Sequence, residues 1–279
     1  MRLDRYTTVI NRTVTRVQEM ESLSPLMAFT AYWKSIYEQE NPLEHLSLYQ
    51  QTALRQLMHR MDVRHYPEPY YGLWGDCLQE DGILLLINPG EVRFDDETVQ
   101  RINQGVQQRF RSWNKDDYLN HDKNNLTNLY DVGLQWRIKR KAQAERIIAQ
   151  LVRFLHIIEY FPYHSKRWNT VKTKEKNCIS TLPGTHLAMR AIIDIAQHKK
   201  ARFIFGIGEP WADIFRQHGF ALQKEELRKP NGKRFSHRLY WMKPTETAIP
   251  IIIYVSGAGG MTLPQEPDVV SRIRALLQV

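Results

Sequence analysis

Cysteine is scarce in this chain of 279 residues, and its scarcity excludes two kinds of site. The only two cysteines, Cys77 and Cys178, lie far apart and form no CxxC pair. Neither a disulfide framework nor a cysteine-based zinc site is expected, because each needs more cysteines at a recognisable spacing. This cysteine usage predicts a cytoplasmic protein, since the cytoplasm keeps thiols reduced.

Long apolar runs are also missing. No segment approaches the roughly 18 consecutive apolar residues that a membrane helix needs, and residues 1–17 lack the apolar centre of a signal peptide. No Pro/Gly/Ser-rich linker divides the sequence into halves. The sequence therefore predicts a soluble protein that folds as one cooperative unit, with no membrane contact.

Several motifs for metal or nucleotide chemistry do not occur. The histidines at 156, 164, 186 and 198 form no HxH or HExxH pattern, which leaves a metal hydrolase with little support. No Walker lysine follows the glycines at 257–260, and no GxGxxG follows the first apolar run. We therefore expect no metal, no cofactor and no obligatory protein partner.

Positive charge is in excess. The chain has 39 Lys and Arg against 30 Asp and Glu, a formal net charge of +9. A basic surface favours a polyanionic partner, because its side chains displace the counterions condensed on phosphates. A merely solubilising surface explains the same number, so charge alone suggests nucleic acid without establishing it.

Apolar runs alternate with helical stretches after about residue 80. The runs cover 83–87, 155–160, 202–205 and 250–255, and the helical stretches cover 96–111, 137–156, 185–198, 210–217 and 266–278. Short continuous apolar runs are typical of parallel strands buried on both faces. The pattern predicts an α/β fold, a three-layer αβα arrangement around a mainly parallel four-stranded sheet, with residues 239–242 as a further strand at an edge.

The first part of the chain differs. Residues 1 to about 66 have helical spacing and no strand rich in Val or Ile, and the proline-containing segment 66–72 is typical of a turn. We therefore expect a helical N-terminal extension over 1–75 and an α/β domain over 76–279.

Gly, Pro, aromatic and polar residues gather directly after the four predicted strands, in the segments 88–91, 161–165, 206–211 and 256–261. Ligands of open parallel sheets bind beyond the carboxyl ends of the strands. These four segments are therefore the expected site.

The first segment resembles a known motif. Ile87-Asn88-Pro89-Gly90 is similar to the first motif of the uracil-DNA glycosylase superfamily, particularly its mismatch-specific branch, and the order of strands and loops resembles that family over about 80–265. The resemblance implies that Asn88 positions a hydrolytic water or supports the anomeric carbon of the sugar, while the backbone of Pro89 and Gly90 lies close to a flipped nucleotide. An amide orients water but is a poor base, so Glu91, or else Asp95 or Asp96, is the candidate base. The alternative is a common turn after a strand.

The second segment follows a strand where the superfamily has a base-recognition residue. Phe161 and Tyr163 are candidates to stack on a flipped base, and His164 is a candidate for catalysis and for hydrogen bonds to the base. Glu159 is a weaker recognition candidate. Equally, both rings can belong to the core and His164 can cap a turn.

The fourth segment departs from the family pattern. No histidine stands in Ser256-Gly257-Ala258 to stabilise a departing uracil, so the resemblance favours excision of a modified base. Small residues there can bind phosphate through backbone N–H groups, with Met261 as a wedge into the base stack. The predicted DNA-binding residues are Lys166, Arg167, Ser256, Gly257, Gly259, Gly260 and Met261.

The family resemblance thus implies a DNA glycosylase. Bacterial antiphage members of this superfamily remove bulky modified cytosines, such as glucosylated hydroxymethylcytosine, from phage DNA and leave abasic sites. That is the expected function and partner. Two alternatives stay open: a catalytically silent DNA-binding or sensing protein on the same fold, and a uracil or mismatch repair glycosylase.

Overall fold

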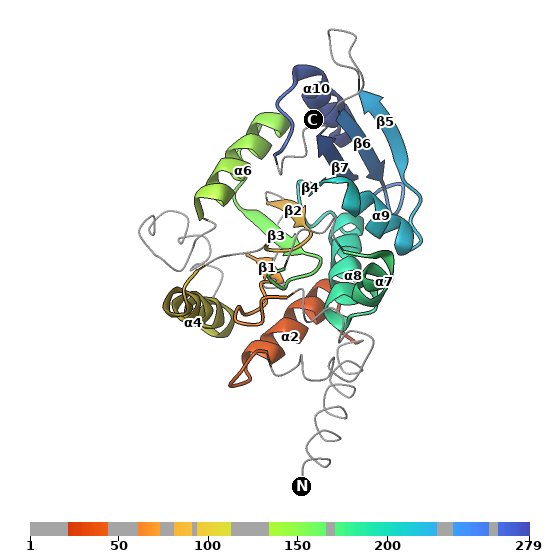
Figure 1. Cartoon of the computed structure of the whole chain (residues 1–279). Coiled ribbons are helices and arrows are strands. Elements are labelled where there is room, and N and C mark those ends of the chain that lie inside the picture. The colour runs from red at the N-terminus through yellow and green to blue at the C-terminus, as the bar shows by residue number, and fades with distance from the viewer. Residues whose placement is uncertain are drawn as a thin grey trace.

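A computed structural model of the chain describes residues 22–43, 61–72, 81–90, 94–112, 134–165, 171–227, 237–256 and 262–279, and it shows a mixed α/β fold (Figure 1). The strands are β1 (Tyr70–Tyr71), β2 (Gly82–Leu86), β3 (Leu155–Glu159), β4 (Phe203–Ile207), β5 (Gln223–Leu227), β6 (His237–Met242) and β7 (Ile251–Ser256). The helices are α2 (Pro25–Tyr37), α4 (Asp96–Ser112), α6 (Leu134–Ile148), α7 (Thr173–Ser180), α8 (Pro183–Gln197), α9 (Glu209–Gln217) and α10 (Pro267–Leu277). Among the described helices, none has both the length and the apolarity to cross a membrane.

The strands form one seven-stranded sheet in the order β1-β3-β2-β4-β7-β6-β5. β3, β2, β4 and β7 pair in parallel, and they are the four apolar runs of the sequence. β1, β6 and β5 pair antiparallel with their neighbours. Within the described residues the sheet therefore has seven strands rather than the four predicted. The strand expected at an edge, β6, lies inside the sheet because β5 pairs outside it.

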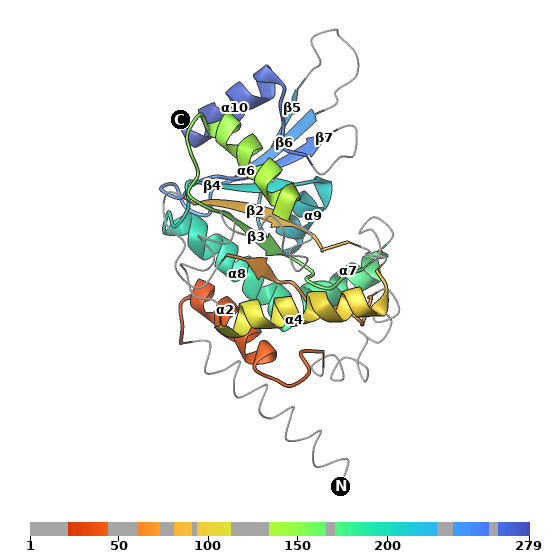
Figure 2. The same ribbon diagram turned by 90° about the vertical axis from the view of Figure 1, so that its left-hand side faces the viewer.

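Successive residues of β2 contribute to different cores. Ile83 and Leu85 belong to a cluster with residues of α2, α4, α8 and α9, whereas Leu84 and Leu86 belong to a cluster with residues of α6 and α10. Side chains alternate between the two faces of a strand, so helices lie on both faces of the sheet (Figures 1 and 2). This double coverage explains the continuous apolar sequence of the parallel strands.

The chain reverses direction across the sheet at β2. From β2 it moves to β3 on one side, and from β3 it crosses to β4 on the other side of β2. In open parallel sheets such a reversal leaves a crevice at the carboxyl ends of the strands that flank it. The segment after β2, which begins at Asn88, borders this position.

Helix α2 belongs to the same core as the sheet. Ser24 caps its N-terminus by accepting a hydrogen bond from the Met27 nitrogen at 3.4 Å. Trp33 packs against Gly184 of α8, where a Cβ atom would lie 2.6 Å from the indole ring. A glycine at 184 is therefore needed for α2 and α8 to approach this closely.

Two helices differ from expectation. The helix predicted over 137–156 ends at Ile148, because Ala149 adopts a left-handed backbone with φ of 54° and the chain then turns into β3. Helix α7 was not predicted, since its residues carry little apolar character.

Candidate functional site at the carboxyl edge of the sheet

The parallel strands β2, β3, β4 and β7 end at one edge of the sheet, so their last residues lie near one another there. β4 alone separates β2 from β7. Neighbouring strands lie about 4.8 Å apart, which places the ends of β2 and β7 roughly 10 Å from one another. The residues after these strands are the natural components of a shared site.

Asn88 is held in one orientation. Its Nδ2 donates to the carbonyl oxygen of Ser165 at 3.2 Å and to the Ser165 hydroxyl oxygen at 3.0 Å. A carbonyl oxygen only accepts, so the amide must present its NH2 group to Ser165. The Asn88 Oδ1 makes no hydrogen bond with any described residue, and it remains an acceptor for an added molecule.

Pro89 and Gly90 complete this turn and are partly exposed. Gly90 has a φ of +82°, and a Cβ atom built there would meet no atom within 4 Å. Glycine is therefore favoured at this position by its backbone conformation and not by a close neighbour.

Phe161 and Tyr163, the candidates to stack on a base, are buried in the core on the α8 side of the sheet, at 3 % and 4 % exposed. Their ring centroids are 5.1 Å apart, and Tyr163 also lies edge-on to Trp33 at 6.4 Å. The two rings pack with core side chains. A flipped base would reach neither ring without a rearrangement of this loop.

His164 lies beside Ser165 and forms the centre of a buried polar network. Its Nε2 is 3.0 Å from Oε1 of Glu68, and Oε2 of Glu68 accepts a hydrogen bond from Arg109 at 3.1 Å. Burial alone would raise the pKa of Glu68, but the hydrogen bonds from His164 and Arg109 and the charge of Arg109 outweigh it and lower this pKa to about 2. Glu68 is therefore a carboxylate at neutral pH.

When the His164 ring is neutral, the charge on Glu68 determines which ring nitrogen carries the proton. A carboxylate only accepts, so Nε2 carries the hydrogen and Nδ1 carries the lone pair. The Nδ1 atom is buried and has no hydrogen-bond partner among the described residues. His164 thus combines a carboxylate that orients it with an unused basic nitrogen, the arrangement of an imidazole general base.

His65 packs on His164, with ring centroids 4.4 Å apart. Burial and the nearby His164 lower the pKa of His65, which keeps its ring neutral at pH 7. The stacking disfavours a positive charge on both imidazole rings at once.

The segment 61–71, which precedes β2 in the sequence, brings these residues together. Residues 61–71 run alongside the end of β3 and the loop after it: the Asp62 nitrogen donates to the His164 carbonyl at 2.7 Å, and the Glu68 nitrogen donates to the Pro162 carbonyl at 2.8 Å. β1 continues this pairing with β3. The backbone therefore determines which side chains meet His164.

Helices α2 and α4 hold the same segment from outside. The Tyr37 hydroxyl donates to the carbonyl of Pro67, next to Glu68, and the Tyr37 ring stacks on Phe110 at 4.1 Å. Arg109, beside Phe110 on α4, is 5 % exposed. The helix of the N-terminal part and α4 thus jointly position the Glu68 carboxylate.

Glu159 is the last residue of β3 and is also buried, with its Oε2 unpartnered among the described residues. Burial, and then the charge of Glu68, raise its pKa well above the usual value. Burial therefore favours the neutral form of the Glu159 carboxyl group, close to a carboxylate that remains charged.

The third predicted loop, 206–211, holds a strand against a helix. Glu209, at the start of α9, accepts hydrogen bonds from Arg238 at 2.7 Å and from the Tyr240 hydroxyl at 2.8 Å. Trp211 is fully buried. This loop therefore fastens β6 to α9 and offers no free carboxylate.

The remaining predicted residues are placed as follows. Ser256 ends β7 opposite His237 of β6. Asp95 caps α4 by accepting from the Thr98 nitrogen at 2.8 Å, and Asp96 pairs with Arg64 at 3.0 Å, so both alternative bases have local partners. Residues outside the described part are Glu91, Lys166, Arg167, Gly257, Gly259, Gly260 and Met261.

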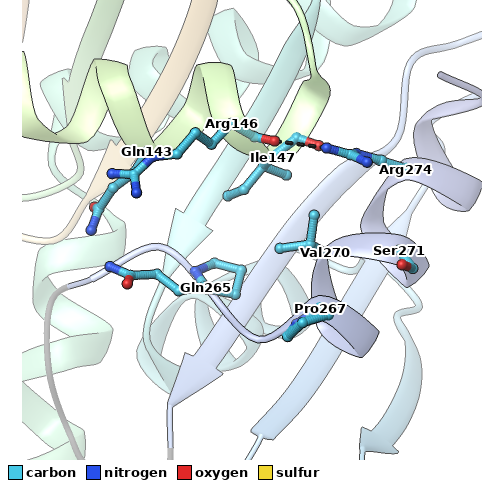
Figure 3. A pocket seen from close by; sticks show the side chains of 9 residues that line it. Gln143, Arg146, Ile147, Gln265, Pro267, Val270, Ser271 and Arg274 are labelled. Carbon is cyan, nitrogen blue, oxygen red and sulfur yellow. Dashed lines mark hydrogen bonds between the residues drawn. The ribbon is translucent and has the colours of Figure 1, made fainter.

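A pocket of about 260 Å³ lies elsewhere, between α6 and α10 (Figure 3). Arg274 on its wall donates to the carbonyl oxygens of Arg146 and Ile147 at 2.8 and 2.7 Å, which satisfies the C-terminal end of α6. Its guanidinium thus joins the two helices. None of the predicted site residues lines this pocket.

Two of the predicted site residues, Asn88 and His164, lie close together in the structure, because Ser165, which follows His164 in the chain, accepts a hydrogen bond from Asn88. The sequence analysis missed Glu68 and His65 altogether. The Pro67-Glu68-Pro69 sequence was the available signal, because a carboxylate fixed between two prolines cannot belong to a helix interior. Within the described part of the chain, no group of three or more His, Cys, Asp or Glu side chains is arranged to hold a metal ion.

Comparison of the chain with protein-family models, with curated proteins and with solved structures finds no match.

Proposed function

We propose that this protein is a cytoplasmic DNA glycosylase that hydrolyses the N-glycosidic bond of a base flipped out of DNA. The observation that carries the proposal is Asn88. Its amide is fixed by Ser165 at the point where the chain reverses across the sheet, with Oδ1 left as an acceptor. The sequence resemblance of the Ile-Asn-Pro-Gly turn supports the same role.

Hydrolysis of this bond needs an oriented water near the sugar and a group that takes a proton from it. In the proposed mechanism the Asn88 Oδ1 accepts from the water and positions it. His164, oriented by Glu68, receives the proton on Nδ1, and Glu91 is the alternative base. As the bond to the base breaks, electrons pass to the departing base and the water oxygen bonds to the sugar carbon.

The proposed substrate is a bulky modified cytosine, such as glucosylated hydroxymethylcytosine in phage DNA. The reason is the absence of a histidine in Ser256-Gly257-Ala258, which leaves uracil without the partner that the superfamily provides. The net charge of +9 supports a polyanionic partner. A uracil or mismatch repair enzyme is the nearest alternative.

The burial of Phe161 and Tyr163 favours a second candidate. A base cannot stack on buried rings, and the His164 Nδ1 is itself covered. A DNA-binding or sensing protein on this fold removes no base, so it would not need accessible Phe161 and Tyr163 rings or an accessible His164 Nδ1.

One experiment separates these candidates. The full chain is incubated with phage DNA that carries glucosylated hydroxymethylcytosine, with unmodified DNA and with uracil-containing DNA. Released base is measured by mass spectrometry and abasic sites by alkaline cleavage. The proposal expects release from the modified DNA, and a loss of roughly 100-fold or more in Asn88→Ala.

Asn41→Ala is the matched control, because Asn41 is exposed and makes only a local bond to the Leu43 nitrogen. Full activity in Asn88→Ala would refute the site while leaving the enzyme class. DNA binding without abasic product on every substrate would instead establish the silent protein.

A further inference from the structure

A second pocket lies beside α8, and neither Asn88 nor His164 lines it. It has a volume of about 340 Å³ and is bordered by the start of α2, by α8 and by the residues that follow α9. Ligand pockets span roughly 300–1,000 Å³, so this one suits a small molecule. Its apolar wall is formed by Pro25, Met189, Ile193 and Phe220.

Hydrogen-bond donors from arginine and histidine also line this pocket. Arg190 lies one helical turn after His186 on α8, and both line the pocket together with His218. Arg190 and His186 form no hydrogen bond or ion pair with any described residue. The pocket therefore presents a cation whose charge is not neutralised within the described structure.

The acidic residue of the pocket does not supply that neutralisation. Asp194 is buried, and its carboxylate contacts Lys200 Nζ at 2.8 Å and His198 Nδ1 at 3.0 Å. Both of its oxygens are thus engaged by residues that follow α8 in the chain. Arg190 remains available to a ligand.

His218 adds an oriented donor. Its Nε2 lies 3.2 Å from the hydroxyl of Tyr160, a buried phenol that keeps its proton because burial raises its pKa. Burial and the neighbouring His186 lower the pKa of His218, so its ring is neutral at pH 7. When Tyr160 donates to Nε2, the hydrogen of His218 resides on Nδ1 and can be donated to an acceptor.

We propose that this pocket binds a small organic carboxylate with an aromatic or aliphatic body, its carboxylate on Arg190 and its body against Met189, Ile193 and Phe220. A guanidinium binds a planar carboxylate through two parallel hydrogen bonds, which favours this group over a neutral one. The site is separate from the proposed glycosylase site and does not depend on it.

Isothermal titration calorimetry of the full chain tests the proposal with 2-naphthoate and its neutral analogue 2-naphthamide. We expect 2-naphthoate to bind more tightly than 2-naphthamide. Arg190→Gln should weaken 2-naphthoate by roughly tenfold or more and leave 2-naphthamide unchanged. The matched control is Arg146→Gln, an exposed arginine at the pocket between α6 and α10, which should bind 2-naphthoate as the wild type does.

Ile193→Trp provides a second measurement, since the larger side chain at this partly buried position would fill the pocket. A variant that melts close to the wild-type temperature should bind neither probe. The proposal is overturned if the wild type binds no 2-naphthoate at millimolar concentration, if Arg190→Gln binds it equally well, or if only Arg146→Gln loses binding.

Discussion

Replacing Glu68 by Gln removes the charge at the centre of the carboxyl-edge network while keeping the side chain's size. The carboxylate accepts from His164 at 3.0 Å and from Arg109 at 3.1 Å, and Arg109 is buried. Lowering the pKa of Glu68 from 4.5 to about 2 corresponds to roughly 3 kcal/mol of stabilisation of the charged form. Because Glu68 is 29 % exposed, solvent screening reduces this, and we expect a loss of about 2 kcal/mol at pH 7.

The sign of the pH dependence follows from the direction of the shift. A carboxyl group whose pKa is lowered by folding contributes its full stability above about 4.5, and that contribution disappears as the pH falls toward about 2. The difference in unfolding free energy between wild type and Glu68→Gln should therefore be constant from pH 7 to about 5 and shrink at lower pH. Urea denaturation followed by circular dichroism at several pH values measures it.

Glu226→Gln is the control, because Glu226 is an exposed strand residue that pairs with the exposed Lys224, and its loss should change stability little. A Glu68→Gln deficit of the same size at pH 3.5 and at pH 7 would refute the reasoning. It would mean that shape, and not charge, determines the contribution of Glu68.

Three further predictions concern neighbouring features. Glu159→Gln should become progressively more stable than the wild type as the pH rises above about 4.5, because folding raises the pKa of Glu159 and the wild-type protein therefore loses stability with rising pH. Urea titrations at several pH values measure this, and a difference that stays constant with pH would contradict the raised pKa. Ser165→Ala should lower the rate of base release by roughly tenfold with little change in substrate binding, since the Asn88 amide then keeps only the carbonyl oxygen as an acceptor. Unchanged kinetics would show that the Ser165 hydroxyl does not contribute to the site. Gly184→Ala should destabilise the protein by about 1–3 kcal/mol in thermal melts, because the added methyl group meets Trp33 at 2.6 Å; an unaltered melting temperature would show that α2 moves freely.

The parallel centre of the sheet was predictable because burial on both faces leaves a continuous apolar sequence. β5 was missed for the opposite reason. Its residues, Gln223–Leu227, are mostly charged and largely exposed, as expected of an edge strand that must not pair with other chains. β1 has only two residues after a proline-rich turn, and it becomes a strand through its pairing with β3. Such pairing leaves no local pattern in the sequence.

The site was predictable only in part. Asn88 and His164 follow predicted strands, so the rule for parallel sheets located them. Glu68 is 96 residues before His164 in the sequence, and they meet because residues 61–71 run back along the end of β3. Phe161 and Tyr163 follow the same strand as His164, yet they face the core. Position after a strand therefore predicts the edge of the sheet at which a residue lies, but not the direction of its side chain.

The two carboxyl groups at this edge differ in charge, and that difference bears on whether the network is only structural. Glu68 is kept ionised by His164 and Arg109, whereas burial and the charge of Glu68 raise the pKa of Glu159 and favour its neutral form. A core that needed only packing would be as well served by apolar residues, since a buried ion pair adds little net stability over them. Groups whose environments push their pKa values apart are characteristic of sites that move protons. If the network serves catalysis, Glu68→Gln must shift the pH dependence of base release as well as stability, because it removes the group that orients His164.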